Sequence, residues 1–165
     1  MTASPLVPGG NQRETDRLIA WGDELREVHQ RLRTALQVAR TSLESGAEDG
    51  PASRDILLFC HGFCTALTGH HQGEDRRLFP AIEEAHPELT GVLRKLTEDH
   101  VLISQLLEDL ESAVTSADAP KHLASRLDGI AAIMESHFQY EERQLLAILD
   151  SLQLDAPPHD VLGPL

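Results

Sequence analysis

Aromatic residues are scarce in this chain of 165 residues, where Phe, Trp and Tyr together make up 4% of the sequence. Val, Ile, Thr and Tyr are also too sparse to favour a sheet protein, because strands are enriched in these types. Ala, Leu, Glu, Arg and Gln dominate instead, and these are good helix formers. Since 41% of the residues are apolar and the length suits one domain, we expect a single all-α domain.

Basic residues are few relative to acids. The 14 Lys and Arg stand against 27 Asp and Glu, which gives a formal net charge of −13 with neutral histidine. Nucleic acid and anionic membrane surfaces attract basic patches, and no basic stripe is visible in this balance. We therefore expect neither nucleic acid nor a membrane as a partner.

Long apolar runs and cysteine motifs are missing as well. No apolar stretch approaches the length of a membrane-spanning helix, and the first ten residues lack the basic and apolar regions of a secretory signal. Cys60 and Cys64 do not have the Cys-x-x-Cys spacing of redox or zinc motifs, so we interpret them as small apolar core residues. These absences favour a cytoplasmic protein.

Apolar residues recur with helical spacing in four long segments. The expected helices cover residues 14–43, 54–85, 88–115 and 120–152. Pro80 stands where it would kink the second helix near its end. The apolar stripe expected on the second helix consists of Ile56, Phe59, Phe63 and Leu67.

The loops between these segments are short. Four amphipathic helices with short connections bury their stripes against one another, which predicts an antiparallel up-down-up-down four-helix bundle over residues 13–153. Residues 1–12 are expected to be a disordered N-terminus. Residues 154–165 contain Pro157-Pro158 and no periodicity, and we expect them to form a flexible C-terminal tail.

Two segments of the chain match each other closely. His70 is followed four residues later by Glu74, His137 is followed four residues later by Glu141, and an acid follows each glutamate. Positions i and i+4 lie one turn apart on the same face of an α-helix. Each segment therefore directs one imidazole and one carboxylate at the same point.

Every expected helix carries one histidine on its apolar face. A single such histidine is usually a structural core residue, but four helices out of four share the feature here and two add a glutamate. Buried polar groups without partners are costly, and a metal ion removes that cost by taking their lone pairs. The predicted metal ligands are His29, His70, Glu74, His100, His137 and Glu141.

Three further residues remain open in this prediction. His71 lies beside the apolar stripe and has Asp75 four residues later, so it is an extra ligand or a neighbour of the ligands. His61 falls on a polar face and is expected to be structural. Tyr140, next to Glu141, is either an oxidisable group or an ordinary surface tyrosine.

Imidazoles and carboxylates without thiolates suit iron, manganese or zinc. The simplest arrangement has two ions. His29 and His70 would bind one ion, His100 and His137 would bind the other, and the two glutamates would bridge them. Each ion would keep open positions for water, dioxygen or peroxide, whereas a structural zinc needs fewer ligands.

Taken together, these residues resemble the hemerythrin family, specifically the bacterial hemerythrin-like proteins called HHE cation-binding domains. The resemblance covers residues 14–150 and is carried by Val28-His29, His70 to Pro80, Asp99-His100 and His137 to Glu142. It implies a four-helix bundle with two iron ions, bridged by carboxylates and by an oxo or hydroxo group. Manganese and zinc rank behind iron, and no residue is assigned a catalytic role.

The sequence departs from the oxygen-carrying members in two places. Those proteins have a second histidine one turn after the third-helix histidine, where this chain has Ser104, and their last carboxylate follows its histidine by five residues, whereas Glu141 follows by four. One iron therefore loses a nitrogen ligand, which argues against reversible oxygen carriage.

The resemblance implies small-molecule partners, namely O2, H2O2 or NO. The leading hypothesis is a di-iron protein that acts on dioxygen or hydrogen peroxide, as a catalase, peroxidase or oxidase. The alternative is non-catalytic binding, sensing or storage of O2, NO or iron. A third possibility is a purely structural bundle, and the sequence does not decide between enzyme and binding protein.

Overall fold

The structure, a computed structural model, describes residues 19–44, 54–116 and 118–164. The helices in chain order are α1 (Trp21–Glu44), α2 (Arg54–Gly73), the π-helix η1 (Glu74–Leu78), α3 (Phe79–Ala85), the 3₁₀-helix η2 (Pro87–Leu89), α4 (Thr90–Thr115), α5 (Pro120–Leu149) and α6 (Pro158–Leu162). No strand occurs in these three stretches. The prediction of an all-α protein is confirmed.

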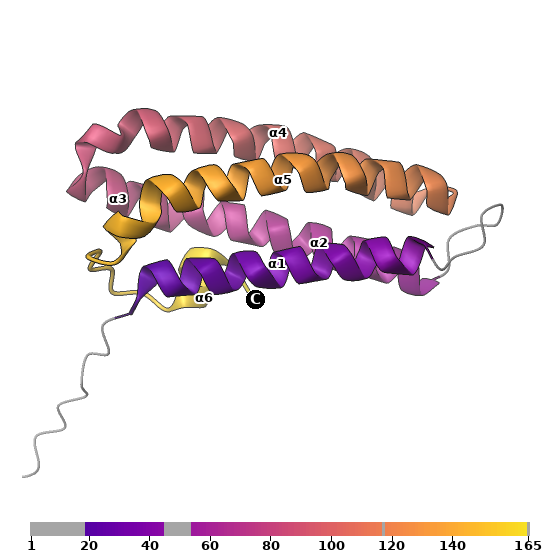
Figure 1. Ribbon diagram of the computed structural model, residues 1–165, viewed down its shortest axis with the longest axis horizontal. Helices are drawn as coiled ribbons and strands as arrows, with labels where there is room; N and C mark the ends of the chain where they lie inside the picture. Colours follow the sequence, from indigo (N-terminus) through magenta and orange to yellow (C-terminus); the bar gives the residue numbers. More distant parts are fainter. Residues whose placement is uncertain (1–18, 45–53, 117, 165) are drawn as a thin grey trace, which may run out of the picture.

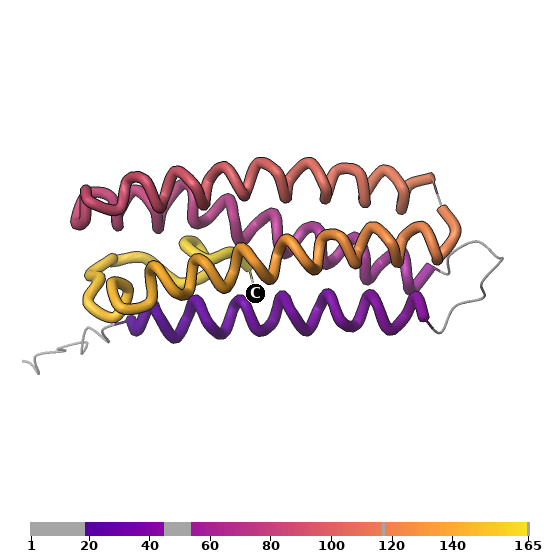
Figure 2. The backbone as a smooth tube through the Cα atoms, turned by 45° about the horizontal axis from the view of Figure 1, so that its top comes forward, coloured from indigo at the N-terminus to yellow at the C-terminus, as the bar shows by residue number. Residues whose placement is uncertain are grey.

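The long helices α1, α2, α4 and α5 run side by side along the long axis of the molecule (Figures 1 and 2). Each of them contacts two others: α1 packs on α2 and α5, and α4 also packs on α2 and α5. Apolar residues spaced three or four apart face inward, as α1 shows with Leu25, Val28, Leu32 and Leu36. One apolar core therefore fills the space between the four helices.

The start of α1 and one core residue differ from the prediction. The first helix begins at Trp21 rather than at residue 14, and residues 14–18 lie outside the described residues. Phe59, predicted to face the core, is 43% exposed, while the buried stripe of α2 runs instead through Ile56, Cys60, Phe63 and Leu67. The predicted disordered terminus at 1–12 and residues 45–53, in the expected connection between the first two helices, also lie outside the described residues.

The second predicted helix is interrupted. Residues 74–78 form the π-helix η1, in which the N–H of Phe79 donates to the carbonyl of Glu74, five residues earlier. Pro80 stands two residues after the π-helix. In a regular α-helix it would have no N–H to donate to the carbonyl of Arg76, and its ring would crowd that carbonyl. The widened turn before Pro80 relieves this crowding. The expected irregularity is thus present as a π-helix, a feature found frequently at functional sites.

The prediction of a flexible tail over residues 154–165 is wrong for its described part. Residues 158–162 form α6, which packs against α2, η1 and α1. The side chains of Val161 and Leu162 are fully buried, and Figure 1 shows the segment lying along α1 and α2. A helix of five residues is too short to show helical periodicity in the sequence, so it could be recognised only from the structure.

Among the described residues, no helix combines the length and the apolar character that a membrane-crossing helix requires.

Candidate metal centre

A group of polar side chains interrupts the apolar core between the long helices. Its members are His29, His70, His71, Glu74, His100, His137 and Glu141, and each is at most 5% exposed. They come from α1, α2, η1, α4 and α5. All six predicted ligands, together with His71, are therefore brought together by the fold.

The first cluster consists of His29, His70, Glu74 and Glu141. Each residue offers one nitrogen or oxygen, and these four atoms all lie within 4.8 Å of one another. The Nε2 atom of His70 is 3.2 Å from Oε1 of Glu74, and Nε2 of His29 is 3.3 Å from Oε2 of Glu141. Two imidazoles and two carboxylates thus point at one small volume.

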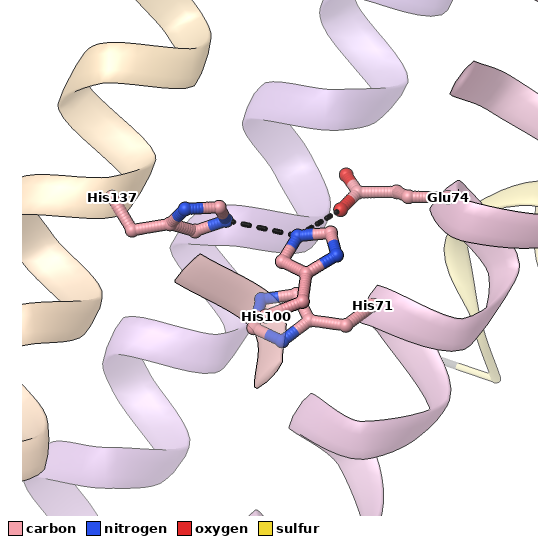
Figure 3. Close-up of side chains that lie close together, drawn as sticks. All are labelled: His71, Glu74, His100 and His137. Atoms are coloured by element: carbon pink, nitrogen blue, oxygen red, sulfur yellow. Dashed lines mark hydrogen bonds and ion pairs between the residues drawn. The ribbon is translucent and has the colours of Figure 1, made fainter. Parts of the chain in front are cut away.

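The second cluster consists of His71, Glu74, His100 and His137, again with one atom from each within 4.8 Å of the others (Figure 3). The Nε2 atom of His100 is 3.3 Å from Oε2 of Glu74 and 3.1 Å from Nε2 of His137. Glu74 belongs to both clusters, with Oε1 near His70 of the first and Oε2 near His100 of the second. A carboxylate placed in this way can bridge two ions.

This arrangement differs from the predicted partition in two respects. His71, left open by the sequence, stands among the potential ligands of the second cluster, and its ring stacks on that of His100 at 4.0 Å between centroids. Glu141 groups with the first cluster, although its Oε2 also lies 3.7 Å from Nε2 of His137. The second cluster therefore offers three imidazoles rather than two.

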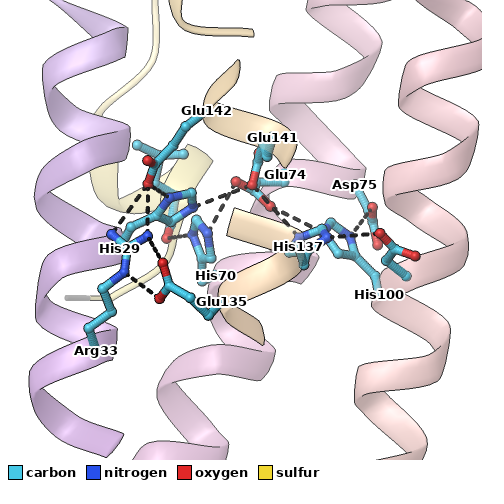
Figure 4. A network of polar contacts seen from close by, with 12 residues as sticks. His29, Arg33, His70, Glu74, Asp75, His100, Glu135, His137, Glu141 and Glu142 are labelled. Carbon is cyan, nitrogen blue, oxygen red and sulfur yellow. Dashed lines mark hydrogen bonds and ion pairs between the residues drawn. The ribbon is translucent and has the colours of Figure 1, made fainter. Parts of the chain in front are cut away.

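Four of the five histidines are anchored through the other ring nitrogen (Figure 4). The Nδ1 atom of His29 contacts Glu142 at 2.7 Å, and that of His70 contacts the carbonyl of Leu162 at 2.9 Å. Since carboxylates and carbonyls accept hydrogen bonds, Nδ1 of each ring carries a proton, and Nε2 is the nitrogen that faces the cluster. Metal-binding histidines in proteins usually have such a partner.

The remaining two anchors are carboxylates. Asp75 accepts from Nδ1 of His100 at 2.8 Å, and Asp99 lies 3.4 Å from Nδ1 of His137. Sequence reasoning had not assigned these roles, yet a signal was available, because an acid follows each glutamate of the two matching segments. Those acids, Asp75 and Glu142, each orient a histidine of a different helix.

An ion-pair network extends this anchoring to the surface. Arg33 of α1 binds Glu135 of α5 through two hydrogen bonds, of 2.8 Å and 3.0 Å. The same guanidinium lies 3.4 Å from Glu142, the partner of His29. Arg33 therefore holds the carboxylate that orients a histidine of the first cluster.

The histidine pKa values reflect the burial of the centre. Burial lowers the pKa of His70 to about 3, and burial together with the neighbouring His100 lowers that of His71 well below its ordinary value. The pKa of His137 is also lowered by burial. Burial acts in the same direction on His29, but its contacts with Glu141 and Glu142 outweigh it and raise that pKa to about 9. Most of these imidazoles are therefore neutral at pH 7, the form that binds a metal.

The two glutamates of the first cluster behave oppositely. Burial, reinforced by the charge of Glu141, raises the pKa of Glu74 well above its ordinary value. Burial also acts to raise the pKa of Glu141, but the contact with His29 outweighs it and lowers that pKa. Without a cation, the pair therefore retains a proton on Glu74, and a bound cation would displace it.

Buried nitrogen and oxygen atoms without hydrogen-bond partners indicate that these residues fit a metal ion. Within the described residues, seven buried side-chain atoms have no hydrogen-bond partner: Nε2 of His29, His70 and His71 and both carboxylate oxygens of Glu74 and Glu141. Unpartnered buried polar atoms are rare because each is energetically costly. A cation in each cluster would use these lone pairs, and nitrogen and oxygen donors without thiolate suit iron, manganese or zinc.

Two residues left open by the sequence have partners outside both clusters. His61 is exposed, and its Nδ1 is 3.0 Å from Glu111. It belongs to neither of the candidate metal groups of the described residues. The ring of Tyr140 has the cations of Lys95 and Arg143 at 5.1 Å and 5.5 Å from its centroid.

A surface groove leads to the second cluster. Its volume is about 400 Å³, and its lining includes Thr68, His71, Gln72, His100, Ser104 and Gln105. Ser104, which stands where oxygen carriers have a further histidine, is exposed in this groove. Water and small solutes can therefore approach His71 and His100 from the side of α2 and α4.

Comparison with known proteins agrees with this arrangement. The family model described as the hemerythrin HHE cation binding domain matches residues 22–149, which include α2, α4 and α5, all of α1 except Trp21, and every residue of both clusters. Searches of curated proteins and of solved structures found no match. On the strength of that match over most of its length, the chain belongs to the hemerythrin HHE cation-binding domain family.

Proposed function

We propose that this protein binds two iron ions and acts on dioxygen or hydrogen peroxide at the buried centre. His29, His70 and Glu141 would hold one ion, His71, His100 and His137 would hold the other, and Glu74 would bridge them. The observation that carries this proposal is the set of unpartnered buried nitrogens and oxygens that converge on two adjacent points. We further infer that α1, α2, α4 and α5 form the up-down-up-down bundle typical of the family.

Iron ranks ahead of manganese and zinc because of the family and the donor set. Bound iron would supply electron exchange with dioxygen or peroxide. The protein would orient four imidazoles before iron binds, through the carboxylates of Glu142, Asp75 and Asp99 and through the backbone carbonyl of Leu162. Such anchoring positions ligands before the metal arrives.

Burial limits what can reach the centre. Every residue of the first cluster is fully buried, so a bulky organic substrate has no contact with it. The groove beside His71 and His100 admits small molecules to the second cluster. Small partners such as O2, H2O2 or NO suit this access.

Non-catalytic binding, sensing or storage of O2, NO or iron is the second candidate. The observation that favours it is the same complete burial, because a centre closed on the side of the first cluster protects a bound diatomic molecule or ion from solvent. The absence of a histidine at Ser104 does not favour reversible oxygen carriage, so the redox role stays first.

The first experiment is to measure metal content per chain on freshly purified protein, with ultraviolet–visible spectra before and after hydrogen peroxide. Two irons whose bands change as peroxide is consumed would support the proposal. Two irons with a stable and reversible oxygen adduct would favour the binding role. No metal, or one zinc per chain, would overturn the ligand assignment.

A pair of variants makes this measurement specific. His137→Ala removes a ligand of the second cluster and should lower the metal content. His61→Ala removes an exposed histidine paired with Glu111 and should leave metal content and spectrum unchanged. Equal metal content in the two variants would contradict the proposed site.

A further inference from the structure

The C-terminal segment packs directly behind a proposed metal ligand. Helix α6 lies against α2 and η1, and Val161 and Leu162 are 0% and 1% exposed. This segment follows the part of the chain that the family match covers, which ends at residue 149. Its role is therefore not explained by family membership.

Two glycines allow this close approach. A Cβ atom at Gly73 would lie 2.5 Å from the carbonyl oxygen of Val161, and one at Gly163 would lie 2.7 Å from the backbone nitrogen of His70. Both distances are far below a normal contact. Gly163 also has φ of +93° and ψ of 176°, a conformation essentially restricted to glycine. Any side chain at either position would push the segment away from α2.

The approach brings a backbone carbonyl to His70. The carbonyl oxygen of Leu162 is 2.9 Å from Nδ1 of His70, and this contact is buried. A carbonyl only accepts hydrogen bonds, so the proton must be on Nδ1 and the lone pair of Nε2 must face Glu74 and His29. The carboxylate partners of the other anchored histidines can be protonated or neutralised, whereas this partner cannot.

We propose that the segment Pro158–Pro164 is a positioning element of the metal centre, in which the Leu162 carbonyl orients His70 and the glycines at 73 and 163 allow it to do so. The part of this inference that concerns metal retention rests on the proposed function. The part that concerns the orientation of His70 holds for the metal-free protein as well.

The test compares Gly73→Ala with Gly62→Ala in the full chain. Both substitutions replace a glycine of α2 by alanine, but a Cβ at Gly62 meets nothing within 4 Å. Iron is loaded, and its loss to a chelator is followed over time. We expect metal to leave the Gly73→Ala protein on the order of 10–100-fold faster, as is usual when the partner of a ligand is lost. Gly62→Ala should retain metal like the wild type.

Two measurements on the metal-free proteins complete the test. Hydrogen exchange of the backbone amides in α6 and Gly163 should accelerate in Gly73→Ala and stay unchanged in Gly62→Ala. A ¹⁵N spectrum of the imidazoles should show His70 of the wild type protonated at Nδ1, and this signal should weaken in Gly73→Ala. Gly163→Ala should also accelerate the exchange and weaken the His70 signal. If circular dichroism shows that Gly73→Ala is unfolded, Gly163→Ala replaces it as the test of the proposal.

Several results would overturn the proposal. If exchange in α6 accelerates but the His70 signal and the metal-loss rate do not change, the segment packs without positioning the ligand. If Gly73→Ala behaves like Gly62→Ala throughout, the close contact is absent. A wild type that binds no metal would contradict the proposed function alone, because the His70 signal and the exchange rates still test the positioning.

Discussion

At the scale of single residues, two adjacent acids in each matching segment have different roles in the centre. Glu74 and Glu141 present unpartnered oxygens to the clusters, whereas the next residues, Asp75 and Glu142, bind histidines on neighbouring helices. One turn of helix thus supplies a ligand and the partner of another ligand. This explains why both matching segments carry two consecutive acids.

Glu142→Ala should weaken metal binding on the order of 10–100-fold, because His29 loses the acceptor that fixes its Nδ1 proton. Glu142→Gln should restore part of the loss, since its amide oxygen still accepts a hydrogen bond. Metal affinity can be measured by competition with a chromophoric chelator. Glu98→Ala, which removes an exposed acid paired with Arg94, serves as the control and should bind metal normally.

Glu74→Leu should have opposite effects on the metal-free and metal-loaded proteins. It removes a fully buried carboxyl whose two oxygens have no hydrogen-bond partner, so the melting temperature of the metal-free protein should rise. It also removes the proposed bridge, so metal content should fall below that of the wild type. Thermal unfolding with and without iron checks both effects, and a lower melting temperature without metal would argue against this account of Glu74.

At the scale of helices, irregular features set the geometry of the centre. The π-helix before Pro80 contains Glu74 and Asp75, which contact groups on α2 and α4. The Arg33 network joins α1 to α5 beside the first cluster. Both features link neighbouring helices at the level of the candidate metal ligands.

Arg33→Lys should loosen the contact between α1 and α5. A lysine cannot form the paired hydrogen bonds that the guanidinium makes with Glu135, so we expect a loss of about 1 kcal/mol in the free energy of unfolding. Chemical denaturation of the variant and the wild type measures this difference in the free energy of unfolding. Arg31→Lys, at an exposed pair with Glu27 on the same helix, should change stability far less. Equal losses in the two variants would contradict a special role for Arg33.

At the scale of the whole molecule, the stability of the metal-free protein should depend on pH with a maximum near 6.5. His70, His71 and His137 have folded-state pKa values below the ordinary 6.5, so below that pH the unfolded chain binds more protons and stability falls with acid. Above pH 4.5, the raised pKa of Glu74 has the opposite effect on stability. Glu74 is a single group, however, whereas three histidines make stability fall in acid. Each net proton contributes about 1.4 kcal/mol per pH unit.

Above pH 6.5 the sign reverses. The folded protein binds more protons than the unfolded chain at His29, whose pKa is raised to about 9, and at Glu74. Stability is therefore lost as pH rises towards 9. Melting temperatures of the chelator-treated protein across this range test the prediction, and stability that rises steadily from pH 6.5 to 9 would contradict it.

The sequence alone was sufficient for the class of fold, the family and the gathering of six polar residues. The reason is that helical periodicity is a local property, and it places one histidine of each helix on the face that turns towards the shared core. The hemerythrin resemblance is likewise carried by short segments and is confirmed by the family match. The identity of the bound metal and the reaction stay predictions.

Only the tertiary structure decided how the centre is divided and closed. The π-helix, the side of α2 on which His71 lies, and the exposure of Phe59 depend on packing between helices rather than on spacing along one of them. The contact of the Leu162 carbonyl with His70 joins residues 92 positions apart through a backbone atom that every residue possesses. A backbone acceptor leaves no mark in a sequence, so its role appears only once the chain has folded.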